Sequence, residues 1–281
     1  MAGLILCGTP IGNLEDVTLR LLRVLGEVDC VACEDTRRTR KLLTHYGISV
    51  RDLVTYNEQN ERRRGDELLR RMQLGQTVAL VSDAGMPGLS DPGYRLVRSC
   101  VDAGVDVSVL PGPTAGVSAI AISGLAPARF VFEGFLPRKT GDRQRRLAEL
   151  QSEPRTIVVY ESPHRIEATL TDMAATMGER PAVLARELTK MHEEVRRSTV
   201  AGLLQGVIDH PPKGEIVLVI EGAIHGSKVI PAPQELAARA RELMDEGVPR
   251  KEALSTVAHE TGAPRRAVFD ALVEPAEPEE S

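Results

Sequence analysis

The feature that most constrains the fold is a regular alternation of short apolar strands and amphipathic helices in the first half of the chain. We expect strands at residues 4–7, 28–33, 53–56, 77–81 and 105–110, and helices at 16–25, 36–46, 60–74, 94–103 and 115–123. Strands and helices in alternation are typical of a parallel sheet covered by helices. The run 77–81 is apolar and β-rich, as expected of a strand buried on both faces.

Glycine-rich segments follow three of these strands. They comprise residues 8–13, 82–93 and 111–114. The carboxyl ends of parallel strands share one edge of the sheet, and ligands of open α/β sheets bind there. Glycine at such an edge lets the backbone approach a ligand closely. The pattern therefore predicts one binding site built from the three segments.

The pattern pauses near residues 125–128, and a second set of elements follows. We expect strands at 130–135, 156–161, 182–188, 195–200 and 215–221, and helices at 142–150, 163–177 and 201–208. Ser162 followed by Pro163 is typical of a helix start, with proline at the first helical position. The close spacing of strands between residues 182 and 221 favours a mixed sheet. We therefore expect two α/β domains, at residues 1–124 and 125–225.

Residues 231–233, with two prolines, indicate a linker to a small helical domain at residues 232–274. We expect its helices at 234–246, 250–260 and 265–273, followed by an acidic, disordered tail at 275–281. Ala258, Gly262 and Val268 fall where a helix-turn-helix has its small residue, turn glycine and core residue. A helical cap that does not contact nucleic acid fits the sequence equally well.

Charge is unevenly distributed in this chain, whose net charge is −5. Basic clusters occur at residues 37–41, 62–64 and 138–146. Each alone is typical of a solvated helix face, but three of them favour a polyanionic partner that binds local patches. No apolar run approaches the roughly 20 residues of a membrane span and no basic leader precedes the first strand, so we expect a cytoplasmic protein without membrane contact.

Four cysteines at irregular positions indicate reduced thiols rather than a disulfide framework. Cys30 and Cys33 form a C-x-x-C pair, but an offset of three along a strand places the two side chains on opposite faces. We therefore expect small buried side chains here and no metal site.

Several common catalytic motifs are absent from the sequence. It has no G-x-G-x-x-G after a strand, no G-x-x-x-x-G-K-[ST], no H-E-x-x-H and no G-x-S-x-G. Dinucleotide, P-loop, zinc peptidase and α/β-hydrolase sites are therefore not expected. The remaining glycine- and proline-rich pocket suits a small amphipathic cofactor held largely by backbone groups.

Eight ordered motifs within residues 4–222 resemble one known family. They are LCGTPIGNLEDVTLR, CEDTRRTRKLL, YNEQNE, VALVSDAGMPGLSDPGYRLV, LPGPTAGVSA, GFLPRK, YESPHRI and ARELTK. Together they look like the ribosomal small-subunit RNA cytidine 2′-O-methyltransferase family, a branch of the tetrapyrrole-methylase-like enzymes. The resemblance implies two α/β domains of tetrapyrrole-methylase type with a small helical appendage. It implies S-adenosyl-L-methionine as the cofactor, bound in the cleft between the two α/β domains. It also implies a homodimer that methylates the 2′-hydroxyl of a cytidine in small-subunit ribosomal RNA, either free or in the assembled subunit.

The resemblance further implies which residues contact the cofactor. They are Pro10, Ser82, Asp83, Ala84, Gly85, Leu89, Ser90, Pro113, Thr114, Ala115, Tyr160 and Leu188. For Asp83, an Asx turn within its own loop is an alternative role. We assign no site role to His164. A hydrogen bond at a helix start is a simpler role for this residue than a contact with the cofactor.

Methyl transfer to a hydroxyl also requires a group that accepts the proton. Candidates are Glu34, Asp35, Glu187 and Lys190, with Glu34 and Lys190 weighted equally. A lysine acts as a base only if its pKa is lowered, whereas a carboxylate is already deprotonated at neutral pH. For each candidate, a structural ion pair is an alternative role.

For RNA contact we expect the side chains of Arg37, Arg38, Lys41, Asn57, Arg138, Lys139 and Arg143. Because only 3% of residues are aromatic and none is Trp, phosphate contacts should dominate over base stacking. Two other functions remain open. One is a tetrapyrrole methyltransferase that uses the same cofactor cleft, and the other is a non-enzymatic nucleic-acid-binding protein that relies on the C-terminal helices.

Overall fold

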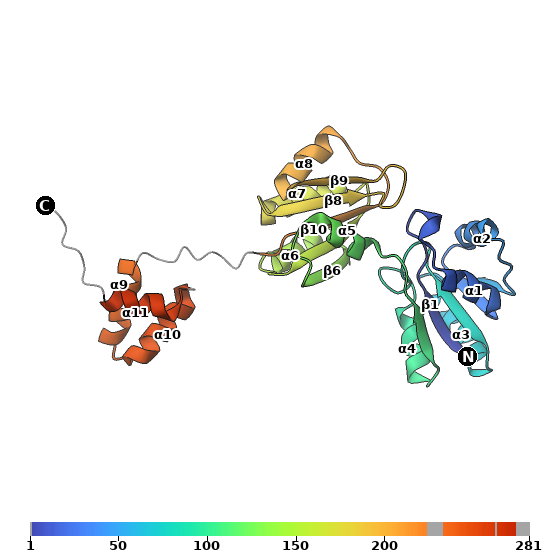
Figure 1. The fold of residues 1–281 in the computed structure, drawn as a ribbon, viewed down its shortest axis with the longest axis horizontal. Coiled ribbons are helices and arrows are strands. Elements are labelled where there is room, and N and C mark those ends of the chain that lie inside the picture. Colours follow the sequence, from blue (N-terminus) through green and yellow to red (C-terminus); the bar gives the residue numbers. More distant parts are fainter. Residues whose placement is uncertain (1, 224–232, 262, 274–281) are drawn as a thin grey trace. The chain divides into compact units, whose positions relative to one another are not determined.

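A computed structural model describes residues 2–223, 233–261 and 263–273 of the chain (Figure 1). The chain divides into two compact units, one that ends at Gly222 and one that begins at residue 223. The predicted tail at residues 275–281 lies outside the described residues.

The first half of the chain forms a five-stranded sheet in which all neighbouring strands are parallel, as predicted. Its strand order is β3-β2-β4-β1-β5. The strands are β1 (Gly3–Cys7), β2 (Cys30–Cys33), β3 (Leu53–Thr55), β4 (Thr77–Val81) and β5 (Val107–Leu110). Between them lie η1 (Leu14–Asp16), α1 (Leu19–Glu27), α2 (Thr36–His45), α3 (Glu61–Gln73) and α4 (Tyr94–Asp102).

Helices cover both faces of this sheet. Residues of α1 and α2 pack with Cys33 in one apolar cluster, whereas residues of α3 and α4 pack with Cys30 in another. The two cysteines therefore lie on opposite faces, as predicted, and burial raises the pKa of Cys30 to about 11. Among the described residues, no group of three or more His, Cys, Asp or Glu side chains is placed to hold a metal ion.

The second half forms a five-stranded sheet of order β6-β7-β10-β8-β9. Strands β6 and β7 are parallel and the other neighbours are antiparallel, so the predicted mixed sheet is confirmed. The elements are β6 (Phe130–Phe135), α6 (Thr140–Leu150), β7 (Thr156–Glu161), α7 (Ile166–Met177), β8 (Pro181–Arg186), β9 (Glu194–Thr199), α8 (Val200–Asp209) and β10 (Ile216–Ile220).

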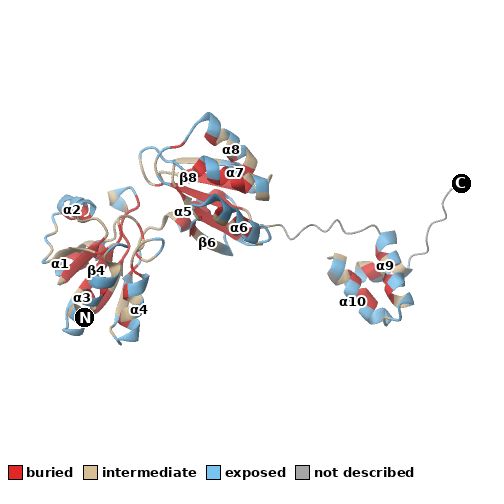
Figure 2. Ribbon diagram, turned by 180° about the vertical axis from the view of Figure 1, so that it is seen from behind, coloured by how far each residue is buried: buried red, intermediate tan, exposed pale blue. Residues whose placement is uncertain are grey.

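Helix α5 (Ala115–Ser123) lies before the predicted domain boundary but packs on the second sheet. Its Ala119 and Ile120 join Val158 and Val217 in one apolar cluster, while α6, α7 and α8 cover the opposite face of that sheet. Figure 2 shows the buried residues concentrated in the strands and in the helix faces turned toward them. We therefore propose that the boundary between the two α/β domains lies at residues 111–114 rather than after residue 124.

Helix α7 begins later than the sequence predicts. The backbone N–H groups of Arg165 and Ile166 both donate to the Ser162 carbonyl, at 3.1 and 3.0 Å. Residues 163–165 therefore form a turn, and the regular helix starts at Ile166 with Arg165 as its N-cap. The prediction of Pro163 as the first helical residue is wrong, because this turn separates it from the helix. His164 is exposed on the turn.

The described residues of the C-terminal unit form three helices, close to the predicted ranges. They are α9 (Pro233–Asp245), α10 (Arg250–Thr261) and α11 (Arg265–Val273). Leu236, Ala240, Val257 and Val268 pack together in its core. Gly262 of the helix-turn-helix pattern lies outside the described residues. In the described part of the chain, no helix has the length and apolar character needed to cross a membrane.

Candidate active site

The three glycine-rich segments meet at the carboxyl edge of the first sheet. Thr9 and Gly85 exchange two backbone hydrogen bonds of 2.9 and 3.1 Å, which join the segments after β1 and β4. The segments after β1 and β5 touch at Gly8 and Gly112, because a Cβ on Gly8 would lie 2.7 Å from the Gly112 Cα. The segments approach this closely because neither glycine carries a side chain.

A cavity of about 390 Å³ lies where these segments face the second sheet. Its volume is within the range of small-molecule sites. Eight of the predicted cofactor residues line it, namely Asp83, Ala84, Gly85, Leu89, Ser90, Thr114, Ala115 and Tyr160. Apolar side chains complete the wall, among them Ile11, Met86, Phe135, Ile216 and Val217.

The other four predicted cofactor residues lie beside this cavity. Pro10 and Ser82 line an adjoining cavity of about 230 Å³, which shares Ile11 and Asp83 with the first. Leu188 is buried in the same apolar cluster as Ile11. The carbonyl of Pro113 would lie 3.5 Å from a Cβ on Gly85, so Pro113 supports the segment that follows β4.

Tyr160 connects the second sheet to the start of helix α5. Its hydroxyl accepts a hydrogen bond of 3.1 Å from the backbone N–H of Gly116. The ring packs edge-on against Phe132 and Phe135. Burial raises the pKa of Tyr160, so its hydroxyl is neutral at physiological pH.

Asp83 links the segment after β4 to the start of helix α2. Its carboxylate accepts a hydrogen bond of 3.1 Å from the backbone N–H of Asp35 and lies 3.4 Å from the Arg38 guanidinium. These partners are far from its own turn in the sequence, so the contacts are not those of an Asx turn. Burial raises the pKa of Asp83 above its ordinary value, against the opposing effects of Asp35 N–H and Arg38.

Asp35 caps helix α2 and does not line the main cavity. Its carboxylate accepts a hydrogen bond of 2.8 Å from the Arg37 N–H and pairs with the Arg37 guanidinium at 2.7 Å. These bonds lower the pKa of Asp35 to about 2. Asp35 is therefore a helix cap and a weak base.

Glu187 and Lys190 belong to a tight turn after β8 that contacts the first glycine-rich segment. Glu187 and Thr189 adopt positive φ angles of 51° and 64°, which are strained for residues with a side chain. Lys190 Nζ lies 2.8 Å from Glu187 and 3.0 Å from Glu215. Burial lowers the pKa of Lys190, but its bonds to Glu187 and Glu215 outweigh burial and leave the pKa above its usual value.

The Glu187 carboxylate also holds the backbone of the next strand. Its Oε1 accepts a hydrogen bond of 2.9 Å from the Glu215 N–H, and a Cβ on Gly214 would lie 2.2 Å from that oxygen. Burial acts to raise the pKa of Glu187, but the bonds from Lys190 and Glu215 keep it below its usual value. Glu187 and Lys190 therefore act as a locked ion pair, and Lys190 is protonated at neutral pH.

Most of the predicted RNA-contact residues are accessible. Arg37, Arg38, Lys41, Arg138 and Lys139 are exposed, and Asn57 is half-buried. Lys41 and Arg38 line the adjoining cavity, which places cationic groups beside the main one.

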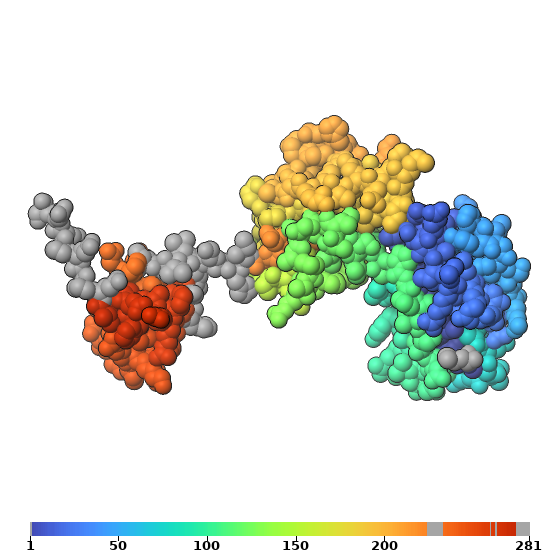
Figure 3. All heavy atoms as spheres, viewed as in Figure 1, coloured from blue at the N-terminus to red at the C-terminus, as the bar shows by residue number. Residues whose placement is uncertain are grey.

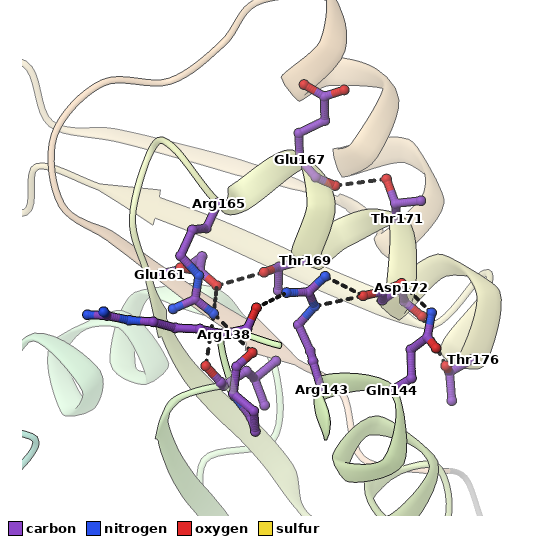
Figure 4. Close-up of polar contacts among 12 residues, drawn as sticks. Arg138, Arg143, Gln144, Glu161, Arg165, Glu167, Thr169, Thr171, Asp172 and Thr176 are labelled. Carbon is purple, nitrogen blue, oxygen red and sulfur yellow. Dashed lines mark hydrogen bonds and ion pairs between the residues drawn. The ribbon is translucent and has the colours of Figure 1, made fainter. Parts of the chain in front are cut away.

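Arg143 is the exception, because its side chain is only 6% exposed. It pairs with the Asp172 carboxylate at 2.6 Å and donates a hydrogen bond of 3.4 Å to the Arg138 carbonyl (Figure 4). The prediction of an RNA contact at Arg143 is wrong, since its guanidinium is enclosed in the protein and holds the residue that precedes Lys139.

A second arginine supports the same loop. Arg165 donates hydrogen bonds to the carbonyls of Leu136, at 2.8 Å, and Pro137, at 3.4 Å, and lies 3.4 Å from Glu161 (Figure 4). Glu161 also accepts a hydrogen bond of 2.7 Å from Thr169 and lines the main cavity. Three consecutive carbonyls, at residues 136–138, are thus held by arginines that are themselves paired with carboxylates.

Three acidic residues of the cavity were missed by the sequence reasoning. Asp91, Glu161 and Glu215 all line the main cavity. Asp91 lies within the glycine-rich segment 82–93, which the sequence already assigned to the site, so this residue could have been predicted. Glu161 and Glu215 stand at the end of β7 and before β10, and only the antiparallel pairing of these strands brings them to one edge of the second sheet.

Solved structures with a similar fold include two methyltransferases and a diphthine synthase. Uroporphyrin-III-C-methyltransferase from Thermus thermophilus has a TM-score of 0.54 at 22% identity and covers 79% of this chain and 94% of its own. The methyltransferase CobJ has a TM-score of 0.61 at 18% identity, with 79% and 95% covered. Diphthine synthase has a TM-score of 0.58 at 16% identity, with 78% and 90% covered. At these identities the likeness establishes the fold.

Proteins with similar sequences show which family the chain belongs to. The tetrapyrrole (corrin/porphyrin) methylase family matches residues 3–204. A protein of Synechocystis sp. named ribosomal RNA small subunit methyltransferase I is 46% identical over 275 residues, 98% of each chain. Proteins of that name from Escherichia coli O157:H7 and Thermotoga maritima are 44% and 47% identical, covering 95% and 79% of this chain and 93% and 99% of their own.

The chain therefore belongs to the ribosomal RNA small subunit methyltransferase I family, within the tetrapyrrole methylases. S-adenosyl-L-methionine is its cofactor, as predicted. The uroporphyrin-III C-methyltransferase of Thermus thermophilus, at 19% identity and a TM-score of 0.55, was solved with S-adenosyl homocysteine. The predicted fold class, two α/β domains with C-terminal helices, is confirmed.

Proposed function

We propose that this protein methylates the 2′-hydroxyl of a cytidine in small-subunit ribosomal RNA, in the cytoplasm. The observation that carries the proposal is the high identity, over nearly the whole chain, to proteins named for small-subunit ribosomal RNA methylation. The cavity at the edge of the first sheet, with cationic side chains beside it, is consistent with a small donor and a polyanionic acceptor.

The residues around the cavity fit S-adenosyl-L-methionine. Residues 83–85 and 114–115 line the cavity wall, and Leu89 and Ile11 offer apolar surface. The Asp83 carboxylate can accept hydrogen bonds from hydroxyl groups of the ligand. When bound, the cofactor supplies a methyl group on a positively charged sulfur. The protein contributes alignment, which can provide up to about 7–11 kcal/mol in ideal intramolecular systems.

Within this proposal, Glu187 and Lys190 position the site rather than accept a proton. Lys190 is paired with two carboxylates and is cationic, so it has no free electron pair at neutral pH. The turn that carries both residues also binds the first glycine-rich segment, since Thr189 Oγ1 accepts a hydrogen bond of 3.0 Å from the Asn13 N–H.

For the RNA we propose contacts from Arg37, Arg38, Lys41, Asn57, Arg138 and Lys139. Contacts between cationic side chains and phosphates release counterions, so affinity falls as salt rises. We expect the logarithm of the association constant to decrease with the logarithm of salt concentration, with a slope reduced by about 1 in Lys139→Ala. Fluorescence anisotropy with a small-subunit RNA fragment measures this slope, and a flat response would contradict the assignment.

We further propose a homodimer in which a second copy covers the edge strand β6 and helix α5. Side chains of Phe130, Phe132, Val117 and Ile122 are exposed there despite their apolar character. Residues of this part of the chain (green) lie at the surface of the face shown in Figure 3. Light scattering is expected to give twice the chain mass, and a monomer mass at micromolar concentration would contradict it.

The reaction is tested by incubating the purified protein with labelled S-adenosyl-L-methionine and one of three acceptors. These are assembled small subunits that lack the modification, free small-subunit RNA, and a porphyrinogen. We expect label in the RNA of one of the first two, with mass spectrometry locating it on the ribose of a cytidine. Label in the porphyrinogen alone would instead identify a tetrapyrrole methyltransferase. A chain that binds RNA but gives no calorimetric signal with the donor would be a non-enzymatic binding protein.

A further inference from the structure

Three carboxylates from the first α/β domain line the main cavity. Glu34 follows β2, and Asp83 and Asp91 lie in the segment after β4. Glu161 and Glu215 line the same cavity from the second sheet. Only some of these groups are free to act on a substrate, and their contacts distinguish them.

Three of the five carboxylates already have a hydrogen-bond or ion-pair partner within the protein. Asp83 is bonded to the Asp35 N–H and to Arg38. Glu161 is bonded to Thr169 and Arg165 and has a fully buried side chain. Glu215 pairs with Lys190. Within the described part of the chain, Glu34 and Asp91 have no ion-pair partner, which leaves these two carboxylates for chemistry.

The backbone just before Asp91 is in close contact with the second sheet. The preceding residue, Ser90, has a φ of 63°, and a Cβ on Gly134 would lie 2.8 Å from the Ser90 Oγ. The segment is therefore pressed against β6 in a conformation that residues with a side chain rarely adopt, as happens at functional sites. The Ser82 hydroxyl donates to the carbonyls of Ala84 and Gly85 and acts to lower the pKa of Asp91.

We propose that Asp91 is the residue that takes the proton from the ribose hydroxyl during methyl transfer, an inference that rests on the proposed function. The 2′-oxygen forms a bond to the methyl carbon while the methyl–sulfur bond breaks and its electron pair stays on the sulfur. The hydroxyl proton passes to the Asp91 carboxylate and is then released to solvent. Asp91 is a catalytic residue in this scheme, whereas Ser90 positions it.

The surroundings of Asp91 make it a stronger base than an exposed aspartate. Burial, followed by the nearby charges of Glu34 and Asp83, raises the pKa of Asp91 to about 7, with a further contribution from Glu215 and an opposing one from Ser82. Tyr160 faces it from β7, and Arg38 is a cation that lines the same cavity. A base with a pKa near the working pH is efficient in proton transfer.

The test is the pH dependence of methyl transfer by the full chain under single-turnover conditions. Because the active form is the carboxylate, the rate of the wild-type protein should rise with pH through about 7 and then level off. Asp91→Asn should lower the rate by about 10²–10⁴-fold and remove this rise, while its calorimetric Kd for the donor changes little. Asp91→Glu should restore part of the rate.

Glu34→Gln provides the matched control. Removing the Glu34 charge takes away a cause of the raised pKa, so the midpoint of the pH profile should move to lower pH while the rise itself remains. The same shift should appear in the carboxyl ¹³C titration of Asp91 by NMR, without RNA or donor. An Asp91→Asn variant that retains both the rate and the rise would overturn the proposal, as would loss of the rise in Glu34→Gln. If the wild-type protein methylates no RNA, it is the proposed function that fails, and the NMR titration still reports on Asp91.

Discussion

At the residue scale, Arg143 shows how burial changes the role of a charged side chain. It lies in a basic cluster, yet its guanidinium is enclosed and paired with Asp172, which also accepts a hydrogen bond of 2.9 Å from Gln144. A buried ion pair contributes little net stability, but removing one partner leaves an uncompensated charge in the interior. Removing one member of the pair therefore lowers the stability by more than the intact pair contributes to it.

We expect Asp172→Ala to lower the free energy of unfolding by about 3–5 kcal/mol, because Arg143 loses its partner in a buried site. Urea denaturation followed by circular dichroism measures this change. Asp142→Ala is the control, since Asp142 pairs with Arg145 at the surface and an exposed pair is worth about 0–1 kcal/mol. Equal effects of the two substitutions would show that burial of the Arg143 pair has no energetic consequence.

At the element scale, the site depends on how closely the strand-end segments approach one another. A Cβ on Gly112 would lie 2.8 Å from backbone atoms of Gly8, which cannot move aside as a flexible side chain can. Residues 8–13 and 111–114 would have to separate to accommodate it. The sequence predicts that these segments share one edge, but only the structure shows that they touch.

We expect Gly112→Ala to weaken donor binding about 5- to 150-fold, because overpacking of a tight contact costs about 1–3 kcal/mol. Isothermal titration calorimetry with S-adenosyl-L-methionine measures the effect. Gly141→Ala is the control, since a Cβ there meets no atom within 4 Å and Gly141 lies in helix α6. Unchanged affinity in Gly112→Ala would mean that the contact does not shape the cofactor site.

At the scale of the whole molecule, the α/β unit and the C-terminal helices are separate. The division falls after Gly222, and the Thermotoga maritima relative aligns with this chain over 222 residues, which is 99% of its own length. The α/β unit contains every residue that lines the described cavities.

We expect a fragment of residues 1–222 to bind the donor within about twofold of the full chain, because it retains the whole cavity. Calorimetry on the two proteins measures this. Affinity for small-subunit RNA, measured in parallel, distinguishes the two roles considered for the C-terminal helices: a loss indicates nucleic-acid contact, and no change indicates a helical cap. Loss of donor binding by a folded fragment would contradict the assignment of the cofactor site to the α/β unit.

The sequence by itself determined the order of strands and helices, the parallel first sheet, the mixed second sheet and the segments that form the site. These features follow from local periodicity and from glycine at strand ends, which are properties of neighbouring residues. Only the tertiary structure decided that α5 packs on the second sheet, that Arg143 is buried, that Lys190 is locked between two carboxylates and that Asp91 has no ion-pair partner among the described residues. Burial and pairing depend on residues far apart in the chain, so no local pattern encodes them.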